Sequence, residues 1–201
     1  MVAIISTLSP LQYSAEMCGA LIEYARHGQV NMIGLLMMAG TTGPVTLPGL
    51  LALQNAEMLA GVTLTQIVNP GAPVIYGGFT TNIDMQSGSP AFGSPEGSLA
   101  LFSGAQLARH YGLPSMCGGL SADAKELDAQ AGFEYAMSIY DSTLNRCNLI
   151  HDCGYLEYGS TLSLDLRRTV DASGTWYVAT GLAQDDYVKN ASFDLTVPGA
   201  F

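Results

Sequence analysis

Three runs between residues 32 and 77 indicate the architecture: MIGLLM at Met32–Met37, LPGLLALQNAEMLAGVTLTQIV at Leu47–Val68 and PVIYG at Pro73–Gly77. The first and third runs are short and uniformly apolar, which is typical of strands buried on both faces of a sheet. The run between them has a helical pattern. A strand, a helix and a second strand in this order predict a right-handed crossover that joins two parallel strands.

The same unit recurs along the chain. Further strand-like runs lie at Val2–Ser6, Leu113–Cys117 and Asn148–Asp152, and further helical patterns at Ala15–His27, Pro95–Tyr111, Ala124–Asn145 and Thr161–Asp171. Successive strands begin about 30 to 40 residues apart, a spacing that suits a (β/α)8 barrel of about 250 residues.

Five such units predict an α/β fold of the (β/α)8 TIM-barrel type, as an incomplete barrel of about five βα units. Either the sheet stays open or the chain is one piece of a longer protein. We assign residues 1–172 to the partial barrel and 173–201 to a divergent tail, for which the sequence predicts no structure.

Two of the helix starts carry capping signals. Ser94-Pro95-Glu96 supplies a capping hydroxyl, a proline at the first helical position and an early carboxylate. Asp123 with Glu126 resembles a capping box and predicts the start of the next helix. In that helix apolar residues recur every three or four positions from Ala129 to Tyr140, which predicts an apolar stripe packed against the sheet.

The composition limits the classes of partner. Hydrophobic residues make up 48% of the chain and charged residues 12%, against about 25% charged residues in a typical soluble domain. This apolar composition excludes disorder as the general state of the chain. A net charge of −10 without clusters of Lys or Arg argues against nucleic acid or an anionic membrane as a partner, and favours a cationic ligand.

The sequence predicts a cytoplasmic protein with reduced thiols. Four polar residues interrupt the longest apolar stretch, Gln54, Asn55, Glu57 and Gln66, so it falls short of the roughly 18 uninterrupted apolar residues of a membrane span. No basic region precedes the first apolar run, so we expect no signal peptide. The cysteines are too irregularly spaced for a disulfide framework: Cys18, Cys117, Cys147 and Cys153.

Ligands of parallel α/β proteins bind at the carboxyl ends of the strands, and the loop at residues 78–93 is the first candidate. It is long and rich in glycine, and with the strand before it offers the aromatic rings of Tyr76, Phe79 and Phe92 and the carboxylate of Asp84. Aromatic faces and a carboxylate are typical of a site for a quaternary ammonium ion. The alternative is that the rings only pack the loop onto the barrel.

A second candidate loop follows the strand that ends near His151. Histidine is the usual acid, base or metal ligand, and Tyr155 and Glu157 lie just beyond it. Neighbouring strand residues point to opposite faces, so His151 and Asp152 do not both face the interior of a barrel. The other two histidines lie near the C-terminal ends of helices, where imidazolium interacts favourably with the helix dipole, and we interpret both as structural: His27 and His110.

We expect no metal site. A zinc site can be drawn from four residues, Cys117, Cys147, His151 and Cys153, but no Cys-x-x-Cys pair exists, and buried apolar cysteines are the favoured interpretation. The glycine pairs at residues 77–78 and 118–119 match neither a P-loop nor a dinucleotide fingerprint. No nucleophile elbow is present either.

Several motifs, in this order, resemble the trimethylamine methyltransferase family. They are Gly43-Pro44-Val45-Thr46-Leu47-Pro48-Gly49, the stretch from Leu53 to Gly61 (LQNAEMLAG), the stretch from Asn69 to Gly78 (NPGAPVIYGG), Phe92-Gly93-Ser94-Pro95-Glu96, Asp128-Ala129-Gln130-Ala131-Gly132 and Asn148-Leu149-Ile150-His151-Asp152. The likeness spans about Ile4 to Asp165, and the pattern ends there.

The resemblance implies a (β/α)8 barrel of more than twice this length, with this chain as a central-to-C-terminal portion. Such enzymes move a methyl group from a methylated amine to the cobalt of a partner corrinoid protein. The archaeal trimethylamine enzymes contain pyrrolysine. Every residue here is an ordinary one, so the chain resembles the wider branch, whose substrates include quaternary amines such as glycine betaine.

The resemblance also implies roles for the candidate residues. A pocket for the cation is expected from Tyr76, Phe79 and Tyr155, and negative potential from Asp84, Asp123 or Glu157. His151 is the expected catalytic residue, in contact with the substrate carboxylate or with groups on the cobalt side. By this resemblance the chain itself binds no cofactor, because the corrinoid (cobalamin) is on the partner protein. The sequence leaves open whether the chain forms a homo-oligomer. Two alternatives remain: a non-catalytic barrel piece that binds a partner, and an unrelated barrel enzyme such as a zinc-dependent methyltransferase.

Overall fold

The computed structural model describes residues 1–119, 121–151, 154–157 and 161–162. At its centre is a five-stranded parallel sheet in which each strand pairs with the one before it in the repeating unit, in the order β1-β2-β4-β7-β8. These strands are β1 (Val2–Ser6), β2 (Val30–Gly34), β4 (Val74–Gly78), β7 (Ser115–Gly118) and β8 (Leu149–His151). The helices between them are α1 (Ala15–Arg26), α2 (Leu47–Val68), α3 (Pro95–His110) and α4 (Ala129–Leu144).

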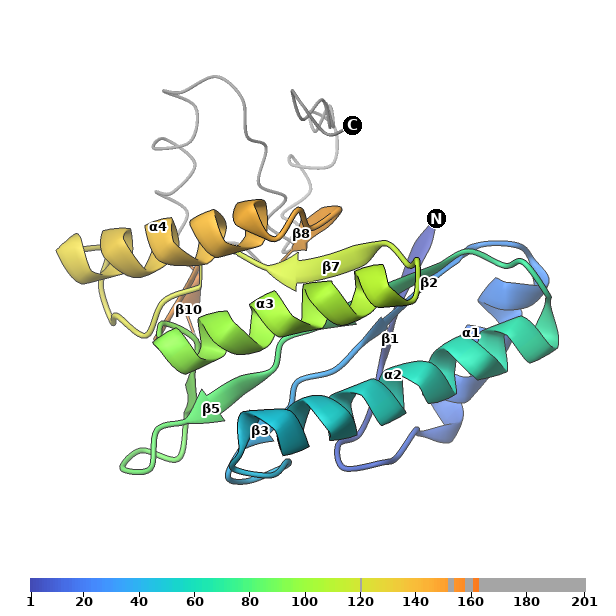
Figure 1. Ribbon diagram of the computed structural model, residues 1–201, viewed down its shortest axis with the longest axis horizontal. Coiled ribbons are helices and arrows are strands. Elements are labelled where there is room, and N and C mark those ends of the chain that lie inside the picture. Colours follow the sequence, from blue (N-terminus) through green and yellow to red (C-terminus); the bar gives the residue numbers. More distant parts are fainter. Residues whose placement is uncertain (120, 152–153, 158–160, 163–201) are drawn as a thin grey trace, which may run out of the picture.

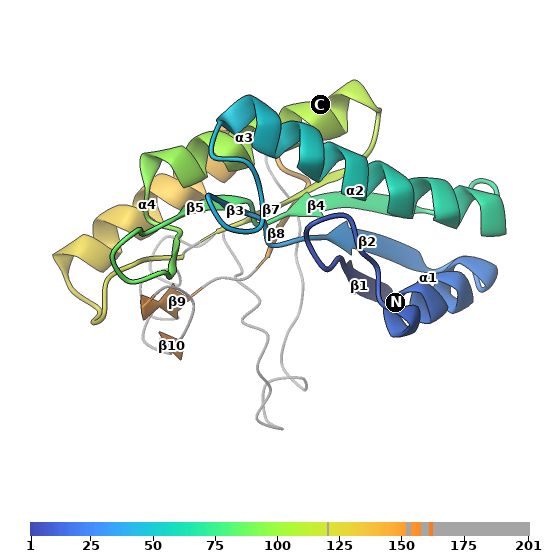
Figure 2. The same cartoon turned by 90° about the horizontal axis from the view of Figure 1, so that it is seen from below.

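The sheet is curled, and the helices cover its outer side. Figure 1 shows α2, α3 and α4 side by side in front of the strands, and Figure 2 shows the strands as an arc with the helices around its convex side. Two small sheets complete the described part: β3 (Met38–Ala39) with β5 (Thr81–Ile83) and β6 (Pro90–Ala91), and β9 (Tyr155–Leu156) with β10 (Thr161–Leu162). The predicted alternation of parallel strands and helices is confirmed.

The main core lies between the first three strands and helices α1 and α2. Ile5, Ile33 and Tyr76 are neighbours across the sheet and are at most 1% exposed. Leu21 of α1 and Met58 of α2, both 0% exposed, belong to the same cluster. Removal of this much apolar surface from water is the dominant stabilising contribution to the fold.

The polar residues that interrupt the apolar run of α2 have definite partners. Asn55 joins two hydroxyl groups, since it donates to Tyr111 at 2.8 Å and accepts from Tyr76 at 3.2 Å. The amide of Gln54 accepts from Thr80, and that of Gln66 accepts from Gly71 N–H at 2.8 Å. These side chains therefore attach the helix to the strands and loops around it, as buried polar groups generally do.

The structure confirms one of the two capping signals. The Ser94 hydroxyl accepts from the N–H of Gly97 at 3.1 Å, with a proline in the first turn of α3. The prediction for α4 was wrong, because Asp128 caps this helix by accepting from Ala131 N–H at 3.0 Å. Asp123 instead accepts from a different loop, so it is not available as a cap.

The predicted orientation of α4 was also wrong. Its large apolar side chains point to solvent: Phe133 (67% exposed), Met137 (42%), Tyr140 (58%) and Leu144 (56%). The buried side carries Ala131, Tyr135, Ser138 and Ser142. Small and hydroxyl-bearing residues let the helix approach the sheet closely, and the Ser142 hydroxyl donates to the Gly118 carbonyl of β7 at 2.7 Å.

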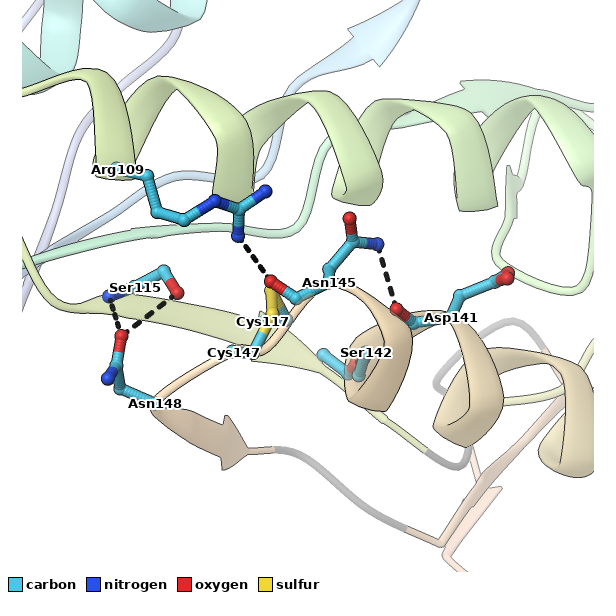
Figure 3. The surroundings of a disulfide bond; sticks show 9 residues. Arg109, Ser115, Cys117, Asp141, Ser142, Asn145, Cys147 and Asn148 are labelled. Atoms are coloured by element: carbon cyan, nitrogen blue, oxygen red, sulfur yellow. Dashed lines mark hydrogen bonds between the residues drawn. A yellow bond between two sulfur atoms is a disulfide. The ribbon is translucent and has the colours of Figure 1, made fainter. Parts of the chain in front are cut away.

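Cys117 of β7 forms a disulfide with Cys147, which follows α4 (Figure 3). The prediction of reduced thiols was therefore wrong for this pair. The bond joins positions 30 residues apart, and Arg109 of α3 donates to the carbonyl of Asn145 beside it. Cys18 is a free thiol, whereas Cys153 lies outside the described residues.

The last predicted elements are only partly covered by the described residues. Thr161 and Leu162 lie in β10, paired with β9, so the helix predicted to begin at Thr161 was wrong at its first two positions. The remainder of that prediction, Asp152 and the tail at 173–201 lie outside the described residues.

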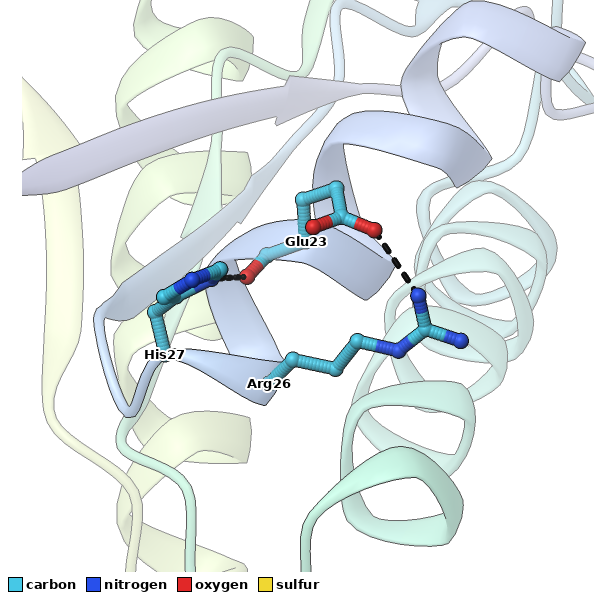
Figure 4. A network of polar contacts seen from close by, with 3 residues as sticks. All are labelled: Glu23, Arg26 and His27. Carbon is cyan, nitrogen blue, oxygen red and sulfur yellow. Dashed lines mark hydrogen bonds and ion pairs between the residues drawn. The ribbon is translucent and has the colours of Figure 1, made fainter.

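Two histidines occupy helix ends, as predicted. At the end of α1 the His27 ring contacts the Glu23 carbonyl through Nδ1 at 2.8 Å, and Glu23 forms an ion pair with Arg26 at 2.8 Å (Figure 4). His110 is the last residue of α3 and packs edge-on against Tyr111. None of the helices in the described ranges combines the length and apolar character needed to cross a membrane.

Candidate binding site at the carboxyl ends of the strands

The loops that follow the parallel strands are joined to one another at one edge of the sheet. The N–H of Thr7 donates to the Gly34 carbonyl at 3.1 Å, and the N–H of Phe79 donates to the Leu35 carbonyl at 2.8 Å. At the other end of the sheet, the N–H of Gly119 donates to the His151 carbonyl at 3.1 Å. The hydrogen-bonding pattern of the sheet thus continues into the loops and holds them beside one another. Parallel α/β proteins bind ligands at this edge of the sheet.

Phe79 and His151 meet at the carboxyl ends of β4 and β8. Cys117 points toward the helices through its disulfide, so the next residue, Gly118, and its register partner His151 point inward. The rings of Phe79 and His151 lie edge to face with centroids 6.4 Å apart. A Cβ atom at Gly118 would lie 3.0 Å from the Phe79 ring, so glycine leaves the space that the ring occupies.

A small pocket adjoins Phe79 between the end of β7 and helices α3 and α4. Its lining includes Phe79, Phe92, Leu101, Gly118, Gly119 and Ser138. Its volume of about 20 Å³ is room for a water molecule. The two phenylalanines of the first candidate loop are thus brought together, in a pocket with a largely apolar wall.

Asp123 joins two loops of this edge. Its carboxylate accepts from the N–H of Phe92 at 2.8 Å, and its own N–H donates to Glu134 at 2.7 Å. Burial raises the pKa of Asp123, and the nearby charge of Glu134 raises it further. Glu134 escaped prediction because it lies inside α4, and only the fold brings it to the loop.

Asp84 lies at the tip of the β5–β6 hairpin. Its carboxylate accepts from the Ser87 hydroxyl at 2.6 Å and from the N–H of Gln86 at 3.0 Å, and these hydrogen bonds lower its pKa. This is the geometry of an aspartate that stabilises a turn. Its role in ligand binding stays a prediction.

Tyr155 and Glu157 lie in and just after β9, alongside the loop between β7 and α4. The carbonyl of Tyr155 accepts from the Tyr135 hydroxyl at 3.0 Å and from the N–H of Ala122 at 2.9 Å. The N–H of Glu157 donates to the Ala124 carbonyl at 2.8 Å. Both residues therefore belong to the same edge as Asp123.

Tyr76 is not brought together with Phe79 and His151. Its side chain lies on the helix side of the sheet, is 1% exposed and donates to Asn55 of α2. Burial raises its pKa to about 12. The tyrosine thus belongs to the core between sheet and helix.

Glu57 of α2 is a residue that sequence reasoning did not select. It is 2% exposed, and its carboxylate accepts three hydrogen bonds from the loop after β1: from the Thr7 hydroxyl at 2.6 Å, the Ser9 hydroxyl at 2.8 Å and the N–H of Leu11 at 2.7 Å. A carboxylate inside an otherwise apolar helix was the available signal, because a buried charge requires partners.

Large apolar side chains are exposed on four successive loops of the same edge. They are Leu8 (55%) and Leu11 (65%) after β1, Leu36 (44%) and Val45 (78%) after β2, Met85 (84%) after β4, and Leu127 (44%) after β7. We call these six residues the apolar rim. Exposed apolar side chains grouped on one edge are typical of surfaces that bind another protein.

Within the ranges that the structure describes, no three residues of the metal-binding types come together. The disulfide uses Cys117 and Cys147, two of the four residues in the alternative zinc site. A third, Cys153, lies outside the described residues.

The family model for trimethylamine methyltransferase (MTTB) matches residues 1–171. The chain is 48% identical over 166 residues to the glycine betaine methyltransferase of Desulfitobacterium hafniense strain Y51, an overlap of 82% of this chain and 35% of the relative. It is 43% identical over 158 residues to trimethylamine methyltransferase MttB1 of Methanosarcina mazei, an overlap of 78% of this chain and 32% of the relative. The chain thus spans about a third of the length of the curated relatives it matches.

Proposed function

This chain belongs to the trimethylamine methyltransferase family, and we propose that it is part of a methyltransferase whose methyl donor is a methylated amine. The observation that carries the proposal is the 48% identity to a glycine betaine methyltransferase over 82% of this chain. Glycine betaine, a quaternary amine, is therefore the donor that we test first. We also propose that the curled sheet supplies five strands of a (β/α)8 barrel, whose inner face holds the donor.

The donor site that we propose lies on the inner face beside Phe79 and His151. The face of an aromatic ring attracts a quaternary ammonium ion, which has no N–H to donate. His151 contacts the carboxylate of the donor, and Asp123, Tyr155 and Glu157 line the same edge. The small pocket behind Phe79 has room only for water, and Tyr76 points into the core, so neither forms part of this site.

The methyl acceptor that we propose is the Co(I) centre of a corrinoid protein, which supplies the nucleophile. A quaternary amine leaves as a neutral tertiary amine, so no proton transfer is required of the protein. The residues of this chain orient the methyl group in line with its acceptor and exclude water, and such positioning contributes several kcal/mol, up to about 10, to lowering the barrier. The apolar rim offers a surface for the partner at the edge where the donor binds.

Calorimetry with glycine betaine, carnitine and trimethylamine tests the donor site. We expect glycine betaine to bind, and Phe79→Ala or His151→Ala to weaken binding at least tenfold. His110→Ala is the matched control, since His110 is exposed at the far end of α3. Binding that survives both Phe79→Ala and His151→Ala would contradict the assignment of the site.

A chimaera tests the activity. Residues 1–171, which the family model matches, replace the matching third of the Desulfitobacterium relative, and transfer of a methyl group from glycine betaine to cob(I)alamin is followed by absorbance. We expect transfer, and we expect it to fall with His151→Ala. A well-folded chimaera without transfer would favour the second candidate, a non-catalytic assembly module. The exposed apolar residues of α4, which also suit a homo-oligomer, are the observation that supports that candidate.

A further inference from the structure

The carboxylate of Glu134 in α4 binds the backbone of the loop after β7. Its Oε2 atom accepts from the N–H of Ala124 at 3.3 Å, besides the hydrogen bond from the N–H of Asp123, and its Oε1 atom accepts from the Gln130 side chain at 2.8 Å. One side chain therefore fixes two consecutive backbone amides of this loop, and Gln130, one turn earlier in the helix, orients the carboxylate.

Gly93 brings the loop after β4 against the same carboxylate. A Cβ atom at Gly93 would lie 2.5 Å from the Cδ atom of Glu134 and 2.7 Å from its Oε2 atom, so glycine leaves the space that the carboxylate occupies. The residue before it, Phe92, donates its N–H to Asp123, and the residue after it, Ser94, caps α3. The loops after β4 and β7 therefore come together at Glu134.

Both loops border Phe79 of the proposed donor site. Phe92 of the first loop and Ser121 of the second line the small pocket beside the Phe79 ring. Ser121 also pairs with Tyr155 in a β-bridge. The surroundings of Phe79 and the place of Tyr155 thus depend on how the two loops are joined.

The junction brings two carboxylates together, those of Asp123 and Glu134. The one ion pair among the described residues joins Arg26 and Glu23 on the surface of α1, so the two like charges are compensated by hydrogen bonds rather than by a cation. Like charges at short range disfavour each other, and a packed arrangement that carries such a cost is typical of functional positions. The backbone donors come from both loops, so the compensation itself holds the loops together.

We propose that Glu134 is a positioning residue, which joins the loops after β4 and β7 through Asp123 and Gly93 and so holds the surroundings of Phe79 in the arrangement that binds the methyl donor. This inference rests on the proposed function. Glu134 does not touch the donor, and it acts through the two loops. Such a site binds more tightly because less freedom is lost when the donor enters loops that are already fixed.

Hydrogen exchange of the 201-residue chain measures the junction directly. In Glu134→Ala the amides of Asp123 and Ala124 lose their acceptor and should exchange at least tenfold faster. The amide of Phe92 should also exchange at least threefold faster, although its acceptor is Asp123 and not Glu134. This third amide separates a joint between two loops from a local contact. The amides of β2 should remain protected and show that the fold persists.

Two further variants and a control sharpen the measurement. Glu134→Gln should have a smaller effect than Glu134→Ala, because its amide oxygen still accepts from the backbone. Gly93→Ala should reproduce the effect of Glu134→Ala with Glu134 intact, because the added Cβ atom displaces the carboxylate. Glu126→Ala, at an exposed carboxylate of the same loop, should leave the exchange of all three amides unchanged.

Calorimetry with glycine betaine measures the consequence for the donor. Glu134→Ala and Gly93→Ala should each raise the Kd at least fivefold, and Glu134→Gln should stay within twofold of the wild type. A purely structural role would lower the stability of the fold and leave the Kd of the folded chain unchanged.

Each outcome decides one part of the proposal. Unaltered exchange of the Phe92 amide in both Glu134→Ala and Gly93→Ala overturns the junction. Faster exchange with an unaltered Kd overturns the positioning role. A wild type that binds no glycine betaine overturns the proposed donor and the donor-facing role with it, and the exchange data then still decide whether Glu134 joins the loops.

Discussion

The two ends of the sheet are stabilised in different ways. Around β1, β2 and β4 a large apolar cluster includes Ile5, Leu21, Ile33 and Met58, each at most 1% exposed. Around β7 and β8 the apolar cluster is smaller and consists mainly of alanines with Tyr135 and Leu156.

The second end has a covalent link that the first lacks among the described residues, and a helix with an exposed apolar side. A disulfide joins β7 to the segment after α4, and the large apolar side chains of α4 face solvent. The first end is thus stable through its own packing, whereas the second relies on a covalent link and its last helix presents a surface suited to a neighbour.

Leu21→Ala tests the packed end and should have the largest effect. Leu21 is 0% exposed in the main cluster, and loss of such a side chain costs about 2–5 kcal/mol of unfolding free energy. Urea denaturation measures the change. Val45→Ala, at a position 78% exposed, is the control, and an effect of the same size there would contradict the assigned core.

Removal of the disulfide should have the next largest effect. The bond closes a loop of 30 residues, and the loss of such a crosslink costs about 2–4 kcal/mol. Cys147→Ser should lower the melting temperature, and a reducing agent should lower that of the wild type but not of the variant. Equal melting temperatures of the oxidised wild type and the variant would show that the crosslink contributes nothing.

Phe133→Ser should change the stability of the isolated chain by less than about 0.5 kcal/mol, because exposed positions tolerate polar residues. Tyr135, on the opposite side of α4, is 3% exposed and bonded to Tyr155. Tyr135→Ala should therefore lower the stability clearly more than Phe133→Ser does, because it removes a buried side chain. A large effect of Phe133→Ser would show that the apolar side of α4 is covered, and light scattering would show whether a second copy covers it.

The smallest of these effects should come from Asp123, which makes the free energy of unfolding depend on pH. The pKa of Asp123 is raised in the folded chain by burial and by Glu134, so the folded state binds more protons than the unfolded state once the pH exceeds about 4. Its contribution is therefore present at low pH and is lost as the pH rises through the raised pKa. The variant Asp123→Asn can still accept a hydrogen bond from Phe92 but does not titrate. Its free energy of unfolding, measured by denaturation at several pH values, should therefore lack this part of the pH dependence.

Much of the fold could be predicted because strands buried on both faces leave a clear apolar pattern. The cap at Ser94 acts locally, so its sequence was sufficient. The side of α4 that faces the sheet could not be predicted, because the helix packs through small residues such as Ala131 and Ser142 while its larger apolar residues face outward. A periodic stripe shows that a helix has an apolar face, but not which surface that face meets.

The candidate site was predictable only in part, because the sequence shows which residues follow strands but not which helix residues the fold brings to the loops. Phe79 follows β4 and His151 is the last residue of β8, so the rule about carboxyl ends selected them. Glu57 and Glu134 lie inside helices and reach the loops only through the folded structure. Tyr76 was predicted to bind the ligand because of its aromatic ring, but its position in the strand directs the side chain into the core.

The strand order has a consequence for synthesis. Because β2, β4, β7 and β8 each pair with the strand of the preceding unit, each of these strands finds its partner already present as the chain leaves the ribosome. These four strands pair with segments made shortly before them, and connections of this kind keep loop-closure entropy low. The sheet can therefore add strands in one direction during translation, from β1 to β8. A further strand would join at the edge formed by β8.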